Sequence, residues 1–446
     1  MTEVTQDRRP APRRPGRRSP VFHGWRIVAV LAFTETVSWG VLYYAFAVFQ
    51  VPMGAELGLS SAQLTGAFSV AVLMTGVAGV WVGRWLDVRG PRGLMTAGAA
   101  VSALLVAAWS QVQTAAGLYL VFAGIGLARA TVLYEPAFAV IIRWFDRQRA
   151  NALLAVTLVA GFASTIALPT SNALAEALGW RDALLVLAAA LAVLTALPHW
   201  LVLRRDPGDL GVHPDGADGA ATPPARRQQA HPPEDPRPGL RATASWAARQ
   251  PAFRWYTAAF ASQSAAVIIV AVHLVPFLRE QGHTPGFAAT ATGALGALSV
   301  TGRLVLTGAA RAVPVARVTA AMFAIQGSSV LVLALAGSSQ AGALAFVLLF
   351  GIGFGVGTVA RPALLAGTFG VTGYATTSGL MVLLITLATT LGPVVAGVAR
   401  TATGTYTIVL LAVGGLCVVA AVSLLRGAPA PQPLSSTGAV SPRLRG

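Results

Sequence analysis

Six ionisable side chains lie inside otherwise apolar stretches of this sequence, and they offer the most scope for chemistry. They are Glu35, Arg129, Glu135, His273, Arg303 and Arg361. A charged residue at the middle of a membrane-spanning helix costs about 2.5–3.5 kcal/mol on insertion scales, so such residues usually face a cavity or one another. An arginine guanidinium can bind a carboxylate through two parallel hydrogen bonds. The set therefore indicates anion binding by arginine and proton binding by glutamate or histidine.

Glu35 is the first candidate proton site. It shares one helical stripe with Trp39, Tyr43 and Phe46. An acid among aromatic side chains suits a proton site or the wall of a substrate cavity, so Glu35, Trp39 and Tyr43 are candidate substrate-binding residues. The alternative is a glutamate that is satisfied by a hydroxyl group of a neighbouring helix.

Three other polar residues complete this group of candidates. Glu135 and His273 are possible proton sites, although a lone histidine in a span more often only makes a hydrogen bond. Gln263 is a further candidate for the cavity wall. None of these residues has the spacing of a metal site, a phosphate-binding loop or a nucleophilic triad, so we expect no enzyme activity and no metal or other cofactor.

Arg129 is the candidate anion-binding residue near the middle of its span. The alternative is an ion pair with Glu35 or Glu135 that only holds helices together. Arg129 and Glu135 are six residues apart and point about 120° apart around an ideal helix, so they need not pair with each other.

A short apolar segment is written twice in the chain. "GIGLARATVLYEPA" begins at Gly124 and "GIGFGVGTVARPA" begins at Gly351, so Glu135-Pro136 corresponds to Arg361-Pro362. Each proline frees a carbonyl group one turn back and permits a bend. Because the charges are opposite at equivalent places, we expect a salt bridge between two halves of the molecule that closes in the outward-facing state. The alternative is that each charge pairs within its own half.

The composition indicates a protein that crosses the membrane many times. The 446 residues are 55% hydrophobic and only 11% charged, whereas soluble domains carry about 25% charged residues. The net charge is +16, and every Lys or Arg position is an arginine. Most of these arginines lie between the apolar stretches, which argues against nucleic acid as a partner. Cys417 is the only cysteine, which excludes a disulfide within one chain.

Twelve apolar segments are long enough to span a bilayer. They lie near residues 26–52, 62–84, 94–112, 115–143, 150–172, 182–203, 253–278, 286–309, 315–336, 340–366, 373–399 and 404–425. Most arginines of the connections share a side with the N-terminus, and only Arg181, Arg279 and Arg400 lie on the other side. Because positive residues favour the inside, we expect both termini in the cytoplasm.

The predicted architecture is an all-α membrane protein with two pseudo-symmetric six-helix bundles. We expect bundles at residues 26–203 and 251–426, a disordered basic tail at 1–25, a disordered cytoplasmic linker at 204–250 and a disordered tail at 427–446. Bundles repeated in the same orientation are typical of secondary transporters that hold a substrate between their halves.

The loop "GRWLDVRGPRG" after the second span closely resembles the signature loop of the major facilitator superfamily. The matching residues are Gly83, Asp87, Arg89, Gly90 and Arg92. Gly83 would let two helices approach closely. Asp87 would lie against the positive N-terminal end of a neighbouring helix, which we expect to be the eleventh span, and would favour the outward-facing state.

Other motifs resemble the monocarboxylate and oxalate porter branch of that superfamily. They are the Trp-Phe pair at 144–145, the Gly-Trp-Arg run at 179–181 and the Gly-Arg pair at 302–303. The resemblance implies that Arg303 contacts a substrate anion. Monocarboxylate porters have an aspartate where this chain has Ser299, and the branch uses lysines that this chain lacks, so the resemblance does not identify the proton-coupling residue.

These observations predict a secondary active transporter in a bacterial inner membrane. It would move a small organic anion such as a monocarboxylate by alternating access, coupled to protons or to a counter-anion, as a monomer in the lipid bilayer. The alternative is a proton-driven drug or metabolite exporter. That class has a Gly-Pro motif in the fifth span, where this chain has Leu168-Pro169. A non-transporting membrane sensor is a third alternative, but it should carry a folded extra domain.

Overall fold

The computed structural model describes residues 22–216 and 239–427, and every regular element in these two ranges is a helix. Helices suit this sequence because a bilayer offers no water to backbone polar groups, which must therefore pair within their own segment. Polar residues start several of them. Ser60 and Gln63, for example, form a reciprocal capping box at the start of the third helix, with Gln63 Oε1 accepting from the Ser60 N–H at 2.9 Å.

The first half of the chain forms the N-terminal bundle. Its helices are α1 (His23–Trp39), η1 (Gly40–Tyr44), α2 (Ala45–Leu57), α3 (Ser61–Arg89), α4 (Pro91–Ser110), α5 (Ala115–Val132), α6 (Tyr134–Trp144), α7 (Arg149–Ala160), α8 (Ala163–Leu191), η2 (Ala192–Ala196) and α9 (Leu197–Val202).

The second half forms the C-terminal bundle. Its helices are α12 (Pro251–Glu280), α13 (Pro285–Ala309), α14 (Val315–Ala336), α15 (Gln340–Phe354), α16 (Val356–Phe369), α17 (Tyr374–Thr403) and α18 (Thr407–Gly427). Between the bundles lie the short helices η3 (Pro207–Leu210) and η4 (Pro214–Gly216), and α11 (Leu240–Arg249).

Eleven helical stretches of the described residues are long and apolar enough to cross a membrane. One of them, Arg149–Val202, has 54 residues and would be about 80 Å long at 1.5 Å per residue, far more than the roughly 30 Å of a hydrocarbon core. Its backbone leaves the helical conformation at Gly179, where φ is 78° and ψ is 163°. This is where the sequence predicts a boundary between two spans.

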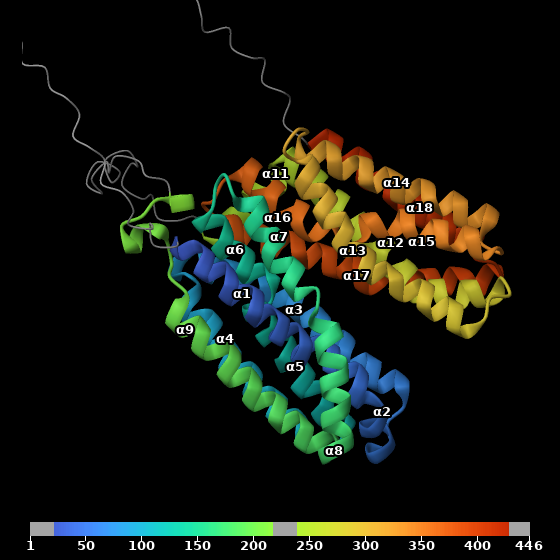
Figure 1. Cartoon of the computed structure of the whole chain (residues 1–446), viewed down its shortest axis with the longest axis horizontal. Helices are drawn as coiled ribbons and strands as arrows, with labels where there is room; N and C mark the ends of the chain where they lie inside the picture. The colour runs from blue at the N-terminus through green and yellow to red at the C-terminus, as the bar shows by residue number, and fades with distance from the viewer. Residues whose placement is uncertain (1–21, 217–238, 428–446) are drawn as a thin grey trace, which may run out of the picture.

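The two bundles meet at one end of the molecule and diverge toward the other (Figure 1). We call their contact surface the seam. It is formed by α3, α6 and α7 of the N-terminal bundle and by α13, α16 and α17 of the C-terminal bundle. The connections α3–α4, α6–α7 and α16–α17 lie at this end, where α1 begins and α18 ends.

The buried apolar residues confirm that the bundles join at one end only. One hydrophobic cluster contains residues of both halves, including Phe138 and Val156 with Val359 and Met381. Two other clusters stay within a single bundle, one between residues 41 and 191 and one between residues 266 and 417. Apolar packing is therefore continuous across the seam and separate beyond it.

The crossing of α3 over α17 depends on glycine. The Cα of Gly379 lies 4.0 Å from where a Cβ on Gly79 would be, and a Cβ on Gly83 would overlap the backbone of Ala375. Small residues allow two helix backbones to approach this closely. The predicted role of Gly83 in close helix packing agrees with this geometry.

The helix is interrupted in both copies of the repeated segment, but the break lies three residues before Pro136 in the first copy and seven residues before Pro362 in the second. In the first copy, α5 ends at Val132 and α6 begins at Tyr134, and in the second copy α15 ends at Phe354 and α16 begins at Val356. Pro136 therefore lies in the first turn of α6, where its missing N–H costs little, whereas Pro362 lies inside α16.

The described part of the predicted linker contains three short helices. Residues 204–216 include η3 and η4, and residues 240–249 form α11, whose Thr243 and Ala247 are buried against the C-terminal bundle. Composition indicated disorder, but Asp, Pro and Gly here form capped turns that pack on the bundles. Residues 217–238 of the linker, 1–21 of the first tail and 428–446 of the last tail lie outside the described residues.

Candidate substrate site and the contacts across the seam

Arg129 is a buried cation without an acidic partner among the residues that the structure describes. Its side chain is only 3% exposed, and neither Nε nor Nη1 makes a hydrogen bond to any described residue. Within residues 22–216 and 239–427, Arg129 forms no ion pair with Glu35 or Glu135, which was the alternative considered above. The guanidinium carbon instead lies 5.1 Å from the ring centre of Tyr43 and 5.7 Å from that of Phe68. Such cation–π contacts stabilise a desolvated cation by about 2 kcal/mol. This is less than the free-energy cost of burying a charge.

An aromatic cluster surrounds this cation. Tyr43 contacts Trp39 and Phe68, with ring centres 5.3 and 5.1 Å apart, and Trp39 also contacts Tyr134 at 5.1 Å. The predicted stripe of span one is therefore assembled, but Phe68 and Tyr134 were not predicted. Both are aromatic residues in apolar spans, and only their partners in the fold distinguish them from ordinary core residues.

The first span is not a regular α-helix at this cluster. Gly40–Tyr44 form a π-helical turn between α1 and α2, which inserts an extra residue in the turn. Single π-turns inside α-helices are frequent at functional sites. Nothing in the sequence predicted this turn, because the residues on either side read as one continuous apolar helix.

Glu35 is completely buried and neither carboxylate oxygen makes a hydrogen bond within the described residues. The indole Nε1 of Trp39, one turn later, also lacks a hydrogen-bond partner within the described residues. A neighbouring hydroxyl group that satisfies Glu35, the alternative considered above, is not found in these ranges.

Arg303 reaches across the seam to a backbone carbonyl group. Its Nη1 donates to the Thr157 carbonyl oxygen at 2.7 Å, and its Nε donates to that of Gly355 at 3.4 Å. Thr157 belongs to α7, and Gly355 lies at the break between α15 and α16. Ser299, one turn earlier, donates to the carbonyl oxygen of Gly296 at 2.6 Å. Arg303 makes no salt bridge to a described carboxylate, so its guanidinium can bind the carboxylate of a substrate.

Glu135 and Arg361 form an ion pair across the seam. Arg361 Nη2 donates to Glu135 Oε1, and the second carboxylate oxygen accepts from Ser378 Oγ of α17 at 2.6 Å. The pairing between halves is thus present in the structure, and the alternative in which each charge pairs within its own half is not.

Asp87 lies at the N-terminal end of α17. Its carboxylate accepts from the Thr376 N–H at 2.8 Å, the Ala375 N–H at 3.3 Å and the Thr376 hydroxyl at 2.6 Å. Arg143 of α6 lies 3.6 Å from the same carboxylate. α17 covers residues 374–403, the region predicted as the eleventh span and expected to be the partner of Asp87, whereas the contact with Arg143 was not predicted.

The two arginines of the signature loop contact aromatic rings of the N-terminal bundle. Arg89 lies over the Trp85 ring at 4.4 Å, and Arg92 lies over the Trp200 ring at 4.1 Å. Gly90 has a φ of 83°, which favours glycine at this turn.

His273 and Gln263 lie inside the C-terminal bundle. His273 Nε2 lies 3.2 Å from the carbonyl oxygen of Pro393, an arrangement typical of a structural histidine, so its placement adds no support for a proton site. Gln263 is buried beside Gly357, whose added Cβ would lie 3.2 Å from Gln263 Oε1. In the repeat, Val356 or Gly357 corresponds to Arg129, so Gln263 faces the second copy of that place.

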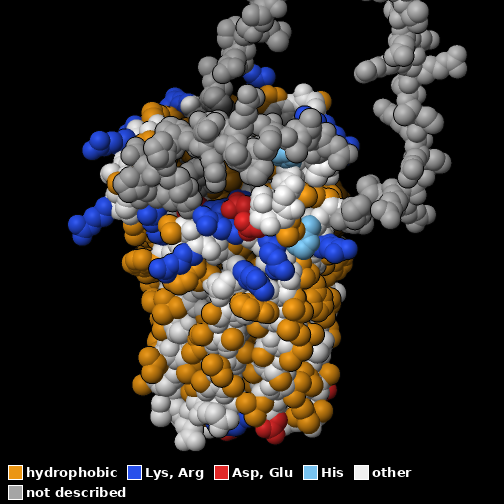
Figure 2. Space-filling view, turned by 90° about the vertical axis from the view of Figure 1, so that its left-hand side faces the viewer, with side chains coloured by type: hydrophobic (Ala, Val, Ile, Leu, Met, Phe, Trp, Pro, Cys, Tyr) orange, Lys and Arg blue, Asp and Glu red, His pale blue; other side chains and the backbone are white. Residues whose placement is uncertain are grey.

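Charged groups elsewhere form a belt rather than a further site. Figure 2 shows arginine side chains around the end where the seam lies, above a broad apolar flank. Within the residues that the structure describes, no group of three or more His, Cys, Asp or Glu side chains could hold a metal ion.

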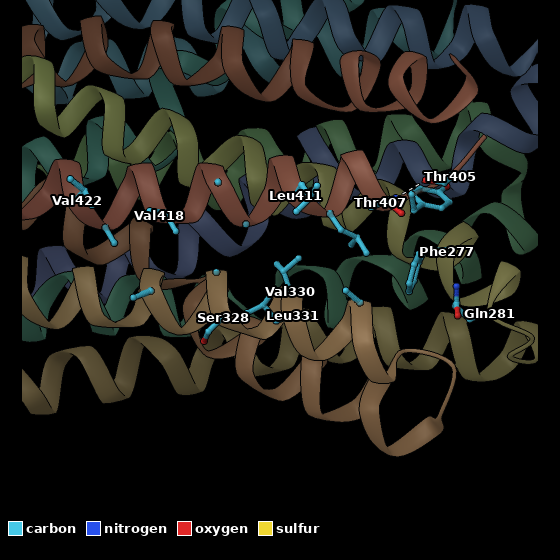
Figure 3. Close-up of a pocket in the computed structure, with 18 of the residues that line it drawn as sticks. Phe277, Gln281, Ser328, Val330, Leu331, Thr405, Thr407, Leu411, Val418 and Val422 are labelled. Carbon is cyan, nitrogen blue, oxygen red and sulfur yellow. Dashed lines mark hydrogen bonds between the residues drawn. The ribbon is translucent and has the colours of Figure 1, made fainter. Parts of the chain in front are cut away.

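A groove of about 960 Å³ lies between α14 and α18, away from the seam. Figure 3 shows its apolar side chains, including Leu331, Leu411 and Val418, with Gln281 and Thr405 at one end. The helices packed against α14 and α18 belong to the C-terminal bundle, so this groove opens on the outer flank and does not include Arg129 or Arg303.

Comparison with known proteins identifies the family. A family model described as the Major Facilitator Superfamily matches residues 28–360. Monocarboxylate transporter 11 of Homo sapiens is 28% identical over 406 residues, which cover 88% of this chain and 80% of that protein.

Solved structures share the fold. The major facilitator superfamily transporter FucP in the outward conformation matches with a TM-score of 0.67 at 17% identity, covering 92% of this chain and 100% of that one. A single-residue variant of the E. coli fucose:proton symporter FucP matches with a TM-score of 0.66 at 16% identity and the same coverage of both chains. The chain belongs to the major facilitator superfamily as a multi-pass membrane transporter, not an enzyme, and it is similar to the monocarboxylate transporter branch.

Proposed function

We propose that this protein carries a small organic anion, such as a monocarboxylate, across the membrane by alternating access. The observation that supports this most is Arg129, a buried guanidinium with two unpaired nitrogen atoms and no carboxylate partner among the described residues. A bound carboxylate would supply the missing charge and two hydrogen bonds. The similarity to monocarboxylate transporter 11 agrees with this substrate class.

Arg303 is the proposed second anion contact. Its present partners are two backbone carbonyl groups, which balance a guanidinium less well than a carboxylate does. Arg129 belongs to the N-terminal bundle and Arg303 to the C-terminal bundle. An anion bound by either can therefore shift the equilibrium between the two arrangements of the bundles. Trp39, Tyr43 and Gln263 would line the same site.

We place twelve spans in the membrane, with both termini in the cytoplasm and the seam on the cytoplasmic side. Dividing Arg149–Val202 at Gly179 makes the eleven helical stretches twelve. The arginine belt at the seam end favours the cytoplasm for that end. The chain then faces outward in this structure, in a bacterial inner membrane.

Glu35 is the proposed proton site. A fully buried carboxyl group without hydrogen-bond partners is costly to ionise. Binding a proton in this state and releasing it when the bundles rearrange would couple transport to a proton gradient. Glu135 is already engaged by Arg361 and Ser378 and better suits a gate.

Uptake into proteoliposomes tests the proposal. The purified protein should accumulate at least one labelled monocarboxylate, and more so with an inward proton gradient. Arg129→Ala should remove this uptake, whereas Arg317→Ala, at an exposed position on α14, should leave it unchanged. Transport of a cationic or neutral drug, with no movement of any carboxylate in the panel, would instead establish the exporter alternative.

A further inference from the structure

The start of α7 is held by a carboxylate from the linker. Asp215 Oδ2 accepts hydrogen bonds from the backbone N–H groups of Asp146 and Arg147 at 3.1 and 2.7 Å, and its Oδ1 accepts from that of Gln148 at 3.2 Å. The N-cap of α7, Gln148, makes no side-chain cap of its own. A linker residue therefore supplies the negative charge that the positive end of this helix attracts.

The backbone of Asp215 is held in an unusual conformation to do this. Its φ is 62°, and it is the described non-glycine residue with a positive φ. This left-handed conformation is uncommon for a residue with a side chain and indicates a specific local constraint. The three hydrogen bonds of its carboxylate provide that constraint.

The same piece of linker reaches a second group at the seam. Asp206 lies 3.7 Å from Arg143, and Arg143 lies 3.6 Å from Asp87, which caps the N-terminal end of α17. We call residues 206–216 the docking segment. It contacts the N-terminal bundle at both of its ends, through Asp206 and through Asp215.

The helices that the docking segment fixes carry two of the polar contacts across the seam. Asp215 binds the loop at residues 146–148, which joins α6 to α7. Of the contacts across the seam, α6 contributes Glu135 and α7 contributes the Thr157 carbonyl group that Arg303 binds. The angle between α6 and α7 therefore decides whether both contacts can form together.

We infer that the docking segment positions α6 and α7 so that the cytoplasmic seam closes, with Asp215 as the positioning residue. This inference rests on the proposed alternating access. Asp215 does not contact the substrate site, so its loss should alter how often the protein faces outward and should change the apparent affinity for an anion only through that population.

The test measures the seam directly, without substrate. Spin labels go on Val88→Cys and Ala312→Cys, which lie on opposite bundles at the seam end, in a Cys417→Ala background that removes the only native cysteine. Distances between the labels are measured in lipid nanodiscs by electron–electron double resonance. Asp215→Ala is compared with Asp182→Ala, a charge-matched control at an exposed position of α8.

In Asp215→Ala, the longer distance of the open seam should become more populated. The ratio of seam-open to seam-closed molecules should rise by about tenfold, which corresponds to the loss of one charged hydrogen bond. Asp215→Asn keeps an acceptor oxygen and tolerates a positive φ. Its distance distribution should therefore lie between those of wild type and Asp215→Ala. In uptake assays Asp215→Ala should change the maximal rate, and KM should change by no more than the outward-facing population does. Distances identical to those of wild type in a folded Asp215→Ala protein would overturn the inference.

If Asp215→Ala does not fold, Asp206→Ala is tested instead. This variant keeps the three hydrogen bonds from backbone N–H groups to Asp215 and removes one carboxylate from Arg143. The same direction of shift is expected, and an unchanged distribution would overturn the inference. Because these distances are read without substrate, failure of the anion proposal would not be confused with failure of this one.

Discussion

Arg303 of the C-terminal bundle donates a hydrogen bond to the carbonyl oxygen of Thr157 in the N-terminal bundle, at 2.7 Å. One guanidinium is thus both a seam contact and the candidate anion contact that the resemblance implies. A substrate carboxylate and the Thr157 carbonyl group would compete for the same donors. Binding of an anion could then weaken the seam, which is what a transporter needs if loaded substrate is to trigger the change of state.

Replacing Arg303 tests this double role. Arg303→Ala should lower the ratio kcat/KM for uptake by about 10–150-fold, the range for losing one charged hydrogen bond of roughly 1.5–3 kcal/mol. Arg303→Lys keeps the charge but not the fork of donors, so it should recover part of the loss. Initial uptake rates over a range of substrate concentrations provide the measurement. Equal kcat/KM values in wild type and Arg303→Ala would remove Arg303 from the site.

Exchanging the charges of Glu135 and Arg361 tests the gate. Glu135→Arg and Arg361→Glu each leave two like charges at a partly buried place in the seam. Breaking a fully buried pair costs about 3–5 kcal/mol, which is the upper limit here, so each exchange should strongly reduce uptake. The double exchange should restore part of the activity, because the pair can form again with reversed polarity.

The pair formed by Glu280 and Arg400 is the matched control for this exchange. Their side chains are 2.9 Å apart, more exposed, and within the C-terminal bundle, where an ion pair contributes about 0–1 kcal/mol. The same three exchanges there should leave uptake close to that of wild type. A double exchange at Glu135 and Arg361 without any recovery would count against a gate between the bundles.

The pairing of Glu135 with Arg361 was predictable because the sequence repeats itself with the charge reversed. The position of Asp87 was predictable because its loop resembles a known signature. In both cases the information is local in the sequence or is duplicated in it. The spans were predictable for a similar reason, since hydropathy acts over about 20 consecutive residues.

Other features depend on contacts between distant segments, and composition could not indicate them. The linker was expected to be disordered because it has little apolar surface, yet a single carboxylate of Asp215 anchors part of it through backbone groups that no sequence pattern identifies. The π-helical turn at Gly40–Tyr44 was missed because it lies in a continuous apolar run. Arg143 and Trp200 became recognisable only from their partners, Asp87 and Arg92.

One added methyl group at Gly83 should disturb the seam. A Cβ there would overlap the backbone of Ala375, which cannot move aside as a flexible side chain can. We expect Gly83→Ala to insert and fold but to lose most uptake, since α3 and α17 could no longer approach in the closed seam. Gly93→Ala is the control, because no atom lies within 4 Å of its added Cβ. Wild-type uptake in Gly83→Ala would show that the seam tolerates a wider crossing.

Replacing Glu35 with glutamine tests whether the buried carboxyl group couples transport to protons. Glu35→Gln keeps the shape of a protonated glutamate but cannot release a proton, and the buried site offers no hydrogen bond that the amide would break. Uptake driven by a pH gradient should therefore disappear, while exchange of internal for external substrate should continue, because exchange needs no proton release. Glu56→Gln is the control, since Glu56 lies at the other end of the span and binds Arg181 at 3.0 Å. If gradient-driven uptake persists in Glu35→Gln, the coupling group lies elsewhere, and Glu135 becomes the next carboxylate to replace.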